Sequence, residues 1–267
     1  MLSFTEHTHP NGVTYMTAPV IRTKHGFSTR YGGVSTGYLS SLNLGSNRGD
    51  APENVFRNYD LLGEATGVPV RHMAFTKQVH GSVVRIATEE DVHGFGTTVP
   101  YEADGLVTDV PGLALICFTA DCVPVLLCDD THGVIGAVHC GWRSSVADIL
   151  GNAVEKMCSL GAVPEQICAA IGPAISKCCF EVGGEVIEAV ERYLGGDTGG
   201  LYDPEPGKEG KFFLDLKAAN ARRLTQLGLL PEHVAVSGEC TVCSHDKYWS
   251  HRYTNGRRGS QGALIVL

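Results

Sequence analysis

The sequence is short of charged and aromatic residues, and it has no apolar run long enough to span a membrane. Only 19% of its 267 residues are charged and 7% are aromatic. Its formal net charge is −8, so it lacks the basic face that binding to a nucleic acid polymer requires. Because a spanning helix needs about 20 consecutive apolar residues, we expect a protein that does not enter a membrane.

A secretory signal is also missing, because residues 1–10 have neither a basic start nor an apolar stretch. We therefore expect a cytoplasmic location, where thiols stay reduced. The ten cysteines are then free thiols, metal ligands or catalytic groups rather than a disulfide framework. A chain of 267 residues also buries enough apolar surface to fold without cross-links.

Short apolar runs bounded by turn residues predict strands. The runs 113–119, 123–128 and 134–139 are almost continuously apolar, which is typical of strands buried on both faces. Periodicity and turn residues predict further strands and helices, the strands at 73–76, 82–86, 167–171, 233–236 and 263–267, and the helices at 50–66, 145–160, 185–194 and 215–228. No repeat or shift in composition marks a boundary. The pattern predicts one α/β-type domain over residues 1–267, with mixed sheets and peripheral helices.

Two long Gly-rich segments, 28–50 and 195–211, predict loops. The first carries Arg30, Asn43 and Arg48, and polar side chains on a long loop favour a substrate-binding role. A mobile surface loop is an equally good interpretation of the same composition.

Three residues at the ends of predicted strands are candidate zinc ligands: His80, Cys122 and His139. Zinc prefers nitrogen and thiolate donors, and catalytic sites keep three protein ligands and one open position. Strand ends hold side chains firmly at one rim of a rigid core. Asp121, beside Cys122, is a candidate for proton transfer. Each residue taken singly is more often packed in a core than bound to a metal.

A helix is predicted to begin at about Ser144 or Ser145, directly after Arg143. Helix N-termini attract anions, and a guanidinium can hold a phosphate between its two N–H edges. A zinc site beside an anion site suggests attack of phosphate, or of water, on a polarised substrate. A structural ion pair is an alternative role for Arg143.

The chain resembles the YfiH/YlmD family, purine nucleoside phosphorylases formerly described as laccase-domain or polyphenol oxidase proteins. The matching motifs run in the same order along nearly the whole chain: HGFSTRYGGVS (25–35), SLNLG (41–45), KQVHG (77–81), DGLVT (104–108), TADCVPVLLCD (119–129), GAVHCGWR (136–143), IGPAI (171–175), EVG (181–183), LDLKAAN (214–220) and CT (240–241).

This resemblance implies an α+β fold with layered mixed sheets and flanking helices, and zinc bound by His80, Cys122 and His139. It implies phosphorolysis of adenosine, inosine and methylthioadenosine, and adenosine deaminase activity. Some family members edit misincorporated serine in peptidoglycan precursors. The expected partners are a small nucleoside and phosphate, and the expected assembly is a monomer or homodimer.

The sequence departs from the family at two places. Cys140 stands where the family has a small residue between its histidine and glycine. The family's C-terminal SYRR motif is Ser250-His251-Arg252-Tyr253 here, so Arg252 is a candidate substrate contact and Arg257 or Arg258 could replace the second arginine.

Three other interpretations stay open. A copper oxidase, suggested by the older family description, needs many paired histidines, and the chain has one His-x-His, at residues 7–9. A Cys-His hydrolase or amidase would use Cys122 as nucleophile, and it would suit peptidoglycan editing. A binding module without catalysis could use Cys240 and Cys243, a CxxC pair that could be a redox motif or half of a structural zinc site. No second pair at suitable spacing accompanies it, because Cys178 and Cys179 are adjacent, so we interpret the pair as packed thiols.

Overall fold

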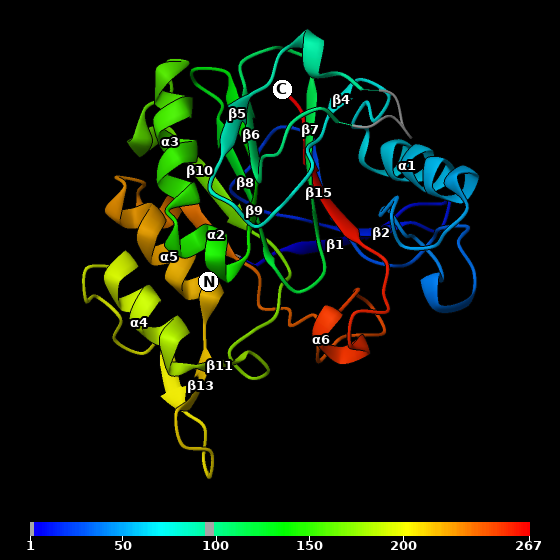
Figure 1. Cartoon of the computed structure of the whole chain (residues 1–267). Coiled ribbons are helices and arrows are strands. Elements are labelled where there is room, and N and C mark those ends of the chain that lie inside the picture. Colours follow the sequence, from blue (N-terminus) through cyan, green and yellow to red (C-terminus); the bar gives the residue numbers. More distant parts are fainter. Residues whose placement is uncertain (1–2, 94–98) are drawn as a thin grey trace.

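Two six-stranded sheets face each other in the computed structural model, which describes residues 3–93 and 99–267 (Figure 1). The first sheet has the order β1 (Thr5–Thr8), β2 (Thr14–Thr17), β3 (His25–Ser28), β15 (Gln261–Ile265), β7 (Ala114–Thr119) and β4 (Met73–Ala74). The second has the order β14 (Val234–Val236), β10 (Cys168–Ile171), β8 (Val123–Asp129), β9 (Val134–Cys140), β6 (Gly105–Thr108) and β5 (Val84–Ile86). A small third sheet has the order β11 (Glu181–Gly183), β13 (Lys211–Leu214) and β12 (Tyr202–Pro204).

Six α-helices accompany the sheets in the described part of the chain: α1 (Pro52–Thr66), α2 (Trp142–Val146), α3 (Ile149–Ser159), α4 (Gly184–Tyr193), α5 (Leu216–Gln226) and α6 (His251–Thr254). Helix α1 covers the outer face of the first sheet, and α3 and α5 cover the outer face of the second (Figure 1). Helix α4 packs on the third sheet. None of the described helices is long and apolar enough to cross a membrane.

The central strands of both large sheets are buried on two faces. In β7, Leu115 and Cys117 pack between the sheets, whereas Ile116 points toward α1. In β8, Leu126 packs between the sheets and Leu127 points toward α3. This alternation follows from the two-residue period of a strand, and it explains why these runs are continuously apolar.

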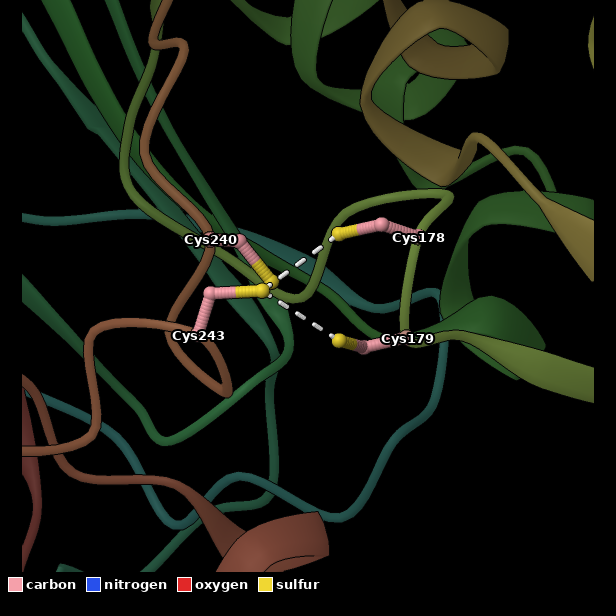
Figure 2. A group of neighbouring side chains, drawn as sticks. All are labelled: Cys178, Cys179, Cys240 and Cys243. Atoms are coloured by element: carbon pink, nitrogen blue, oxygen red, sulfur yellow. Dashed lines mark hydrogen bonds between the residues drawn. The ribbon is translucent and has the colours of Figure 1, made fainter.

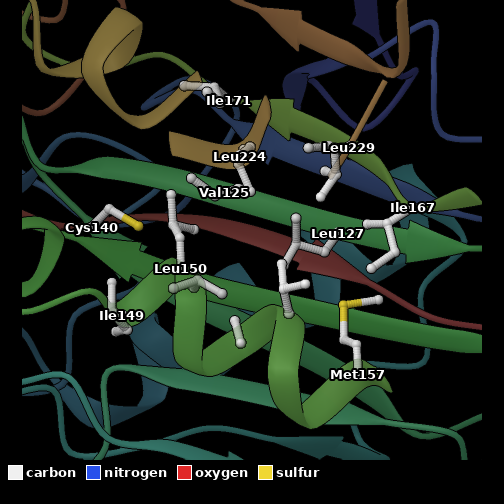
Figure 3. Packing of buried hydrophobic residues seen from close by; sticks show 14 of the residues in the cluster. Val125, Leu127, Cys140, Ile149, Leu150, Met157, Ile167, Ile171, Leu224 and Leu229 are labelled. Atoms are coloured by element: carbon white, nitrogen blue, oxygen red, sulfur yellow. The ribbon is translucent and has the colours of Figure 1, made fainter. Parts of the chain in front are cut away.

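Figure 3 shows the core between the second sheet, α3 and α5. Leu150 and Met157 of α3 meet Val125 and Leu127 of β8 there, and all four side chains are fully buried. Cys140 lies in the same cluster, on the opposite face of β9 from His139. The extra thiol therefore packs behind the sheet, against the helices.

The α+β fold with layered sheets, flanking helices and a single compact body is confirmed. The central strands and α4 and α5 lie within a few residues of their predicted bounds. The single helix predicted at 145–160 is wrong, because Asp148 adopts a left-handed conformation with φ 60° and divides it into α2 and α3. Asp148 then caps α3 by accepting a hydrogen bond from Gly151 N–H.

Two smaller differences have local causes. Helix α1 begins at Pro52, two residues later than predicted, because the Asp50 carboxylate accepts hydrogen bonds from Ser35, Asn43 and Asn54 and does not cap the helix. The segment 195–211 was predicted to be a loop and contains β12, a three-residue edge strand too short to give a periodic signal.

Replacing Leu127 by Ala should lower the free energy of unfolding by about 2–5 kcal/mol, because it leaves a cavity in a fully buried core. Urea denaturation followed by circular dichroism measures the change. Val83→Ala is the control, since that side chain is 58% exposed and should change stability by less than about 0.5 kcal/mol. Equal losses in the two variants would contradict this view of the core.

Candidate metal centre

The register of the second sheet brings Cys122 and His139 together. Strands β8 and β9 are antiparallel, and Val123 pairs with Cys140 while Pro124 pairs with His139. Cys122 directly precedes β8, and His139 is the last residue but one of β9. The start of β8 therefore lies beside the end of β9. Two residues 17 positions apart are held together at the same end of two paired strands in a rigid sheet.

His80 reaches the same place from a loop, between β4 and β5, and one buried carboxylate holds that loop. Asp104 accepts hydrogen bonds from the backbone N–H groups of Val79 at 3.0 Å, His80 at 2.9 Å and Gly81 at 2.8 Å. His80 itself has φ 60°, a conformation that an ordinary residue adopts only when its surroundings impose it. The three hydrogen bonds supply that constraint.

Asp104 also orients His139. Its Oδ1 lies 2.8 Å from His139 Nδ1, and its backbone oxygen accepts a 2.7 Å hydrogen bond from His139 N–H. With Nδ1–H donated to a carboxylate, Nε2 is the nitrogen left to bind a metal, which is the usual arrangement behind a ligating histidine. Burial would raise the pKa of Asp104, but the His139 hydrogen bond and those of the Gly81 and Val79 N–H groups outweigh burial, so the pKa lies below its ordinary value.

The three donor atoms converge on one point. Potential ligand atoms of His80, Cys122 and His139 all lie within 4.8 Å of one another, and Cys122 Sγ is 3.8 Å from His80 Nε2. The two imidazole rings are nearly perpendicular, at 84°, with centroids 4.8 Å apart. Among the described residues, no other group combines histidine with cysteine at these separations. One Cys and two His donors around a single point match the ligand set of a catalytic zinc ion.

The Cys122 thiol and the His139 imidazole shift each other's pKa toward the charged forms. Burial alone would raise the pKa of Cys122, but the charge of His139 and hydrogen bonds from His139 and His80 lower it to about 6. Burial would lower the pKa of His139, but the Cys122 thiolate and the Asp104 carboxylate raise it to about 9. Cys122 is therefore a thiolate at neutral pH, the form that binds metals and attacks carbon.

Gly141 leaves the space that lets the donors approach. A Cβ atom at this position would lie 2.9 Å from His80 Cδ2 and 3.4 Å from Cys122 Sγ. Any side chain would therefore push the His80 ring away from the thiol. The glycine follows His139 and Cys140 directly, so one short segment supplies both a ligand and the room for another ligand.

The three donors lie at one side of a cleft with a volume of about 780 Å³, a size typical of small-molecule sites. Its walls come from both sheets and from distant loops, including segments 44–48, 75–78, 99–102 and 118–120. Tyr59, Phe75 and Phe118 give it an aromatic wall, and Tyr59 and Phe118 meet edge to face with centroids 6.2 Å apart. His80 is exposed, whereas His139 is 3% exposed, so the group is accessible from the cleft on the side of His80.

Two arginines in the same cleft have no carboxylate partner within ion-pair distance among the described residues: Arg48 and Arg258. Arg258 is mostly buried, and its Nε atom has no hydrogen-bond partner. Burial and the nearby charge of Arg48 lower the pKa of Arg258 to about 10. A buried guanidinium with a spare donor next to a second cation is suited to binding an anion.

Two of the predicted substrate contacts are committed to structure instead. The Arg30 guanidinium donates to the backbone oxygens of Ser40 and His245 and stacks on Trp249. Asn43 is fully buried and bonds to four groups within its own loop and the C-terminal segment: the N–H groups of Gly45 and Ser260, the Gly45 oxygen and the Asp50 carboxylate. Neither side chain lines the cleft.

Arg143 and Arg252 also lie outside the cleft lining. Arg143 is exposed and stacks on Trp142, while Arg252 donates to the backbone oxygens of Cys179 and Glu181. The helix predicted to begin at Ser144 or Ser145 is α2, which begins two to three residues earlier, at Trp142, contains Arg143 and has only five residues.

Asp121 lies beside Cys122, as its position in the sequence requires, and both its oxygens accept hydrogen bonds. Oδ1 accepts from Thr241 Oγ1 and Oδ2 accepts from Arg252 N–H, each at 2.6 Å. These bonds tie the turn before β8 to the C-terminal segments. Asp104 and Gly141 are the site residues that analysis of single positions missed, because neither is a ligand and their roles depend on the sheet register.

The chain is similar to known proteins over most of its length. A family model described as multi-copper polyphenol oxidoreductase laccase matches residues 24–267. The chain is 38% identical to a purine nucleoside phosphorylase of Deinococcus radiodurans, over 96% of this chain and 94% of that protein. It is 35% identical to the purine nucleoside phosphorylase YlmD of Geobacillus stearothermophilus, over 90% and 88% of the two chains.

Solved structures show the same fold. The crystal structure of YlmD from Geobacillus stearothermophilus superposes with a TM-score of 0.90, covering 100% of this chain and 99% of that one at 32% identity. The hypothetical protein YfiH of Bacillus licheniformis superposes with a TM-score of 0.89, covering 98% of each chain at 28% identity.

Replacing Gly141 by Ala should weaken binding of Zn²⁺ by about tenfold or more, because the new methyl group displaces the His80 ring. Competition with a chromophoric chelator measures the affinity. Gly184→Ala is the matched control, since its nearest neighbour would be Phe212 at an ordinary 3.9 Å. Unchanged zinc affinity in the Gly141 variant would contradict the proposed convergence of ligands.

Proposed function

The chain belongs to the family described as multi-copper polyphenol oxidoreductase laccase, and we propose that it is a zinc-dependent purine nucleoside phosphorylase. The observation that carries the proposal is the placement of His80, Cys122 and His139 in one cleft with two arginines that form no ion pair with the described carboxylates. Relatives named purine nucleoside phosphorylase, with at least 35% identity over most of the chain, support it independently.

The residues present fit zinc better than a multicopper centre. One thiolate and two imidazoles leave a fourth tetrahedral position facing the cleft, and Asp104 fixes the His139 tautomer. A multicopper centre requires several histidine clusters, and the described residues contain a single group with histidine ligands. A bound zinc ion would supply Lewis-acid polarisation of a substrate oxygen.

Arg48 and Arg258 are the residues that would bind phosphate. Inorganic phosphate carries between one and two negative charges near neutral pH, and a planar guanidinium can donate two N–H groups to it. Burial and the charge of Arg48 lower the pKa of Arg258, and a bound phosphate would offset both effects. The two arginines come from residues 210 positions apart, which meet only in the folded chain.

The aromatic wall of the cleft suits a purine nucleoside. Flat apolar side chains bury a purine face and stack on it, and Phe75 and Phe118 lie in the lining with Tyr59. A cleft of about 780 Å³ has room for a nucleoside and a phosphate together.

In phosphorolysis the glycosidic C–N bond breaks and a phosphate oxygen bonds to the ribosyl carbon, which develops positive charge on the way. Such a reaction depends on holding the two reactants in line and on compensating the changing charges. The arginines hold the nucleophile, the aromatic wall holds the leaving base, and Asp104 keeps the ligand histidines in place. Adenosine deaminase activity at the same site is a second part of the proposal.

The decisive experiment incubates zinc-loaded protein with adenosine, inosine or methylthioadenosine, with and without phosphate. We expect free base to appear only when phosphate is present, together with a ribose 1-phosphate. Ammonia release from adenosine measures deamination separately. Single Ala replacements of His80, Cys122 and His139 should lower bound zinc and reduce turnover by about 100-fold or more.

Cys158→Ala is the control for the cysteine replacement, since Cys158 lies on α3 away from the cleft. Base release that is independent of phosphate would exclude a phosphorylase. Full zinc content and turnover in all three Ala variants would exclude the proposed ligands.

Replacing Arg258 by Met should raise the KM for phosphate by about 10–100-fold, because it removes a charged hydrogen-bond donor from the anion. Arg257→Met is the matched control, since Arg257 is exposed and stacks on Tyr38. Initial rates at varied phosphate concentration measure the KM for phosphate in both variants. A larger effect from Arg257 than from Arg258 would place the phosphate elsewhere.

A Cys-His hydrolase is the second candidate, favoured by one specific observation. Cys122, His139 and Asp104 form a thiolate, imidazole and carboxylate chain of the kind used by nucleophilic cysteine enzymes. The two candidates respond differently to simple reagents. The activity of a Cys-His hydrolase would persist in the presence of a chelator. The zinc phosphorylase should lose its activity with a chelator and recover it when Zn²⁺ is added.

A further inference from the structure

A second group of thiols lies outside the cleft, where two distant segments of the chain meet (Figure 2). Cys178 and Cys179 sit in the turn between β10 and β11, and Cys240 and Cys243 lie between β14 and α6. All four Sγ atoms lie within 4.8 Å of one another. Cys243 Sγ is 3.6 Å from Cys178 Sγ and 3.5 Å from Cys179 Sγ.

The backbone brings these segments together independently of the thiols. Ala174 and Cys240 form a parallel β-bridge, and Thr241 N–H donates to the Ala174 oxygen at 3.1 Å. On this frame the side chains of the adjacent pair and of the CxxC pair point toward one another (Figure 2). Sequence spacing alone could not reveal the group, because the two pairs are about 60 residues apart.

Backbone N–H groups around Cys240 favour negative charge on its sulfur atom. Ser176 N–H donates to Cys240 Sγ at 3.4 Å, and the N–H groups of Val242 and Cys243 are directed at the same atom. Backbone N–H groups aimed at a cysteine sulfur stabilise its thiolate and are typical partners of metal-bound cysteines.

A buried cation lies beneath the same segment. Lys217 is 4% exposed, and its ammonium donates to the backbone oxygens of Ser237 and Glu239. Among the described residues it has no carboxylate within ion-pair distance, and Asp215, Cys240, Cys178 and Glu239 are near enough to interact with its charge. Buried charges are normally compensated, so thiolates at Cys240 and Cys178 would add to the negative charge that Asp215 and Glu239 supply.

Four sulfur atoms at these distances match a single tetrahedral ion. Zn–S bonds of about 2.3 Å place the ligand sulfurs about 3.8 Å apart. A [4Fe–4S] cluster binds each cysteine through a different iron, and a [2Fe–2S] cluster divides the four cysteines between two irons, so clusters spread the sulfurs further apart. Disulfide bonds would need pairs at about 2.05 Å, and the four cysteines are free thiols here.

We propose that Cys178, Cys179, Cys240 and Cys243 bind one zinc ion in a second, structural site. All four tetrahedral positions are filled by protein sulfur, so the ion has no open position for chemistry. Cys178 and Cys243 are exposed, which gives the ion a path from solvent.

The ion would fasten the framework behind the cleft. Thr241, next to Cys240, donates a hydrogen bond to the Asp121 carboxylate. The backbone oxygen of Asp121 accepts a hydrogen bond from Ile175 N–H at 2.9 Å. Asp121 precedes the ligand Cys122. Joining the 174–179 turn to the 240–243 segment therefore stabilises the turn that presents one ligand of the metal centre, although the sulfur site contacts no substrate.

The test measures zinc content and X-ray absorption of the purified full-length protein. We expect two zinc ions per chain, with a first shell averaging about 2.5 sulfurs per zinc, because one site has four sulfur ligands and the other has one. If only the metal centre in the cleft is loaded, the average is about one sulfur. The His80→Ala/His139→Ala variant should keep about one zinc, surrounded by four sulfurs at about 2.3 Å.

The Cys178→Ser/Cys243→Ser variant should lose one zinc per chain, and Cys158→Ser, on a remote helix, should keep both. The X-ray absorption spectrum of the wild-type protein shows whether zinc has a four-sulfur shell, so it tests the proposal even if a serine variant fails to fold. Zinc with no sulfur-rich shell, iron at the four cysteines, or disulfides found there by mass spectrometry would each overturn the proposal. Loss of phosphorylase activity alone would not, because a four-sulfur shell is measured without turnover.

Discussion

The metal centre depends on the hydrogen bonds that the Asp104 carboxylate accepts. This carboxylate accepts three successive backbone N–H groups from the loop that carries His80 and one from the His139 ring. A single buried charge thereby fixes the position of one ligand and the tautomer of another. Without it, His80 would sit on a loop in an unfavourable backbone conformation with nothing to hold it there.

This constraint works because it rests on a rigid sheet. Asp104 directly precedes β6, and β6 pairs with β9, so the carboxylate and His139 are set side by side by strand register. The opposite edge of β9 pairs with β8 and brings Cys122 to the same point. Both faces of these strands are packed, so a change in register would bury polar groups and is strongly disfavoured.

The same donor set is compatible with two chemistries, and its surroundings decide between them. A thiolate, an imidazole and a carboxylate in sequence can act as a nucleophilic chain or as metal ligands with an orienting partner. Two features favour the metal: a second imidazole, His80, close to the thiolate, and the cations Arg48 and Arg258, which have no ion-pair partner in the described part of the chain and line the cleft. A hydrolase has no need of a second histidine on its nucleophile or of two cations beside it.

Local apolar runs in the sequence determined the central strands, and side-chain chemistry at their ends indicated the three candidate donors, because both can be read position by position. The α+β layers followed from the resemblance of the whole sequence to a known family. The sequence missed the break at Asp148, and it assigned substrate contacts to Arg30, Asn43, Arg143 and Arg252, none of which lines the cleft. Only the tertiary structure decided which polar groups face the cleft and which four cysteines meet, since both depend on pairing between strands and loops far apart in the chain. Long-range register carries no signal in a single sequence, and that is the physical reason for the difference.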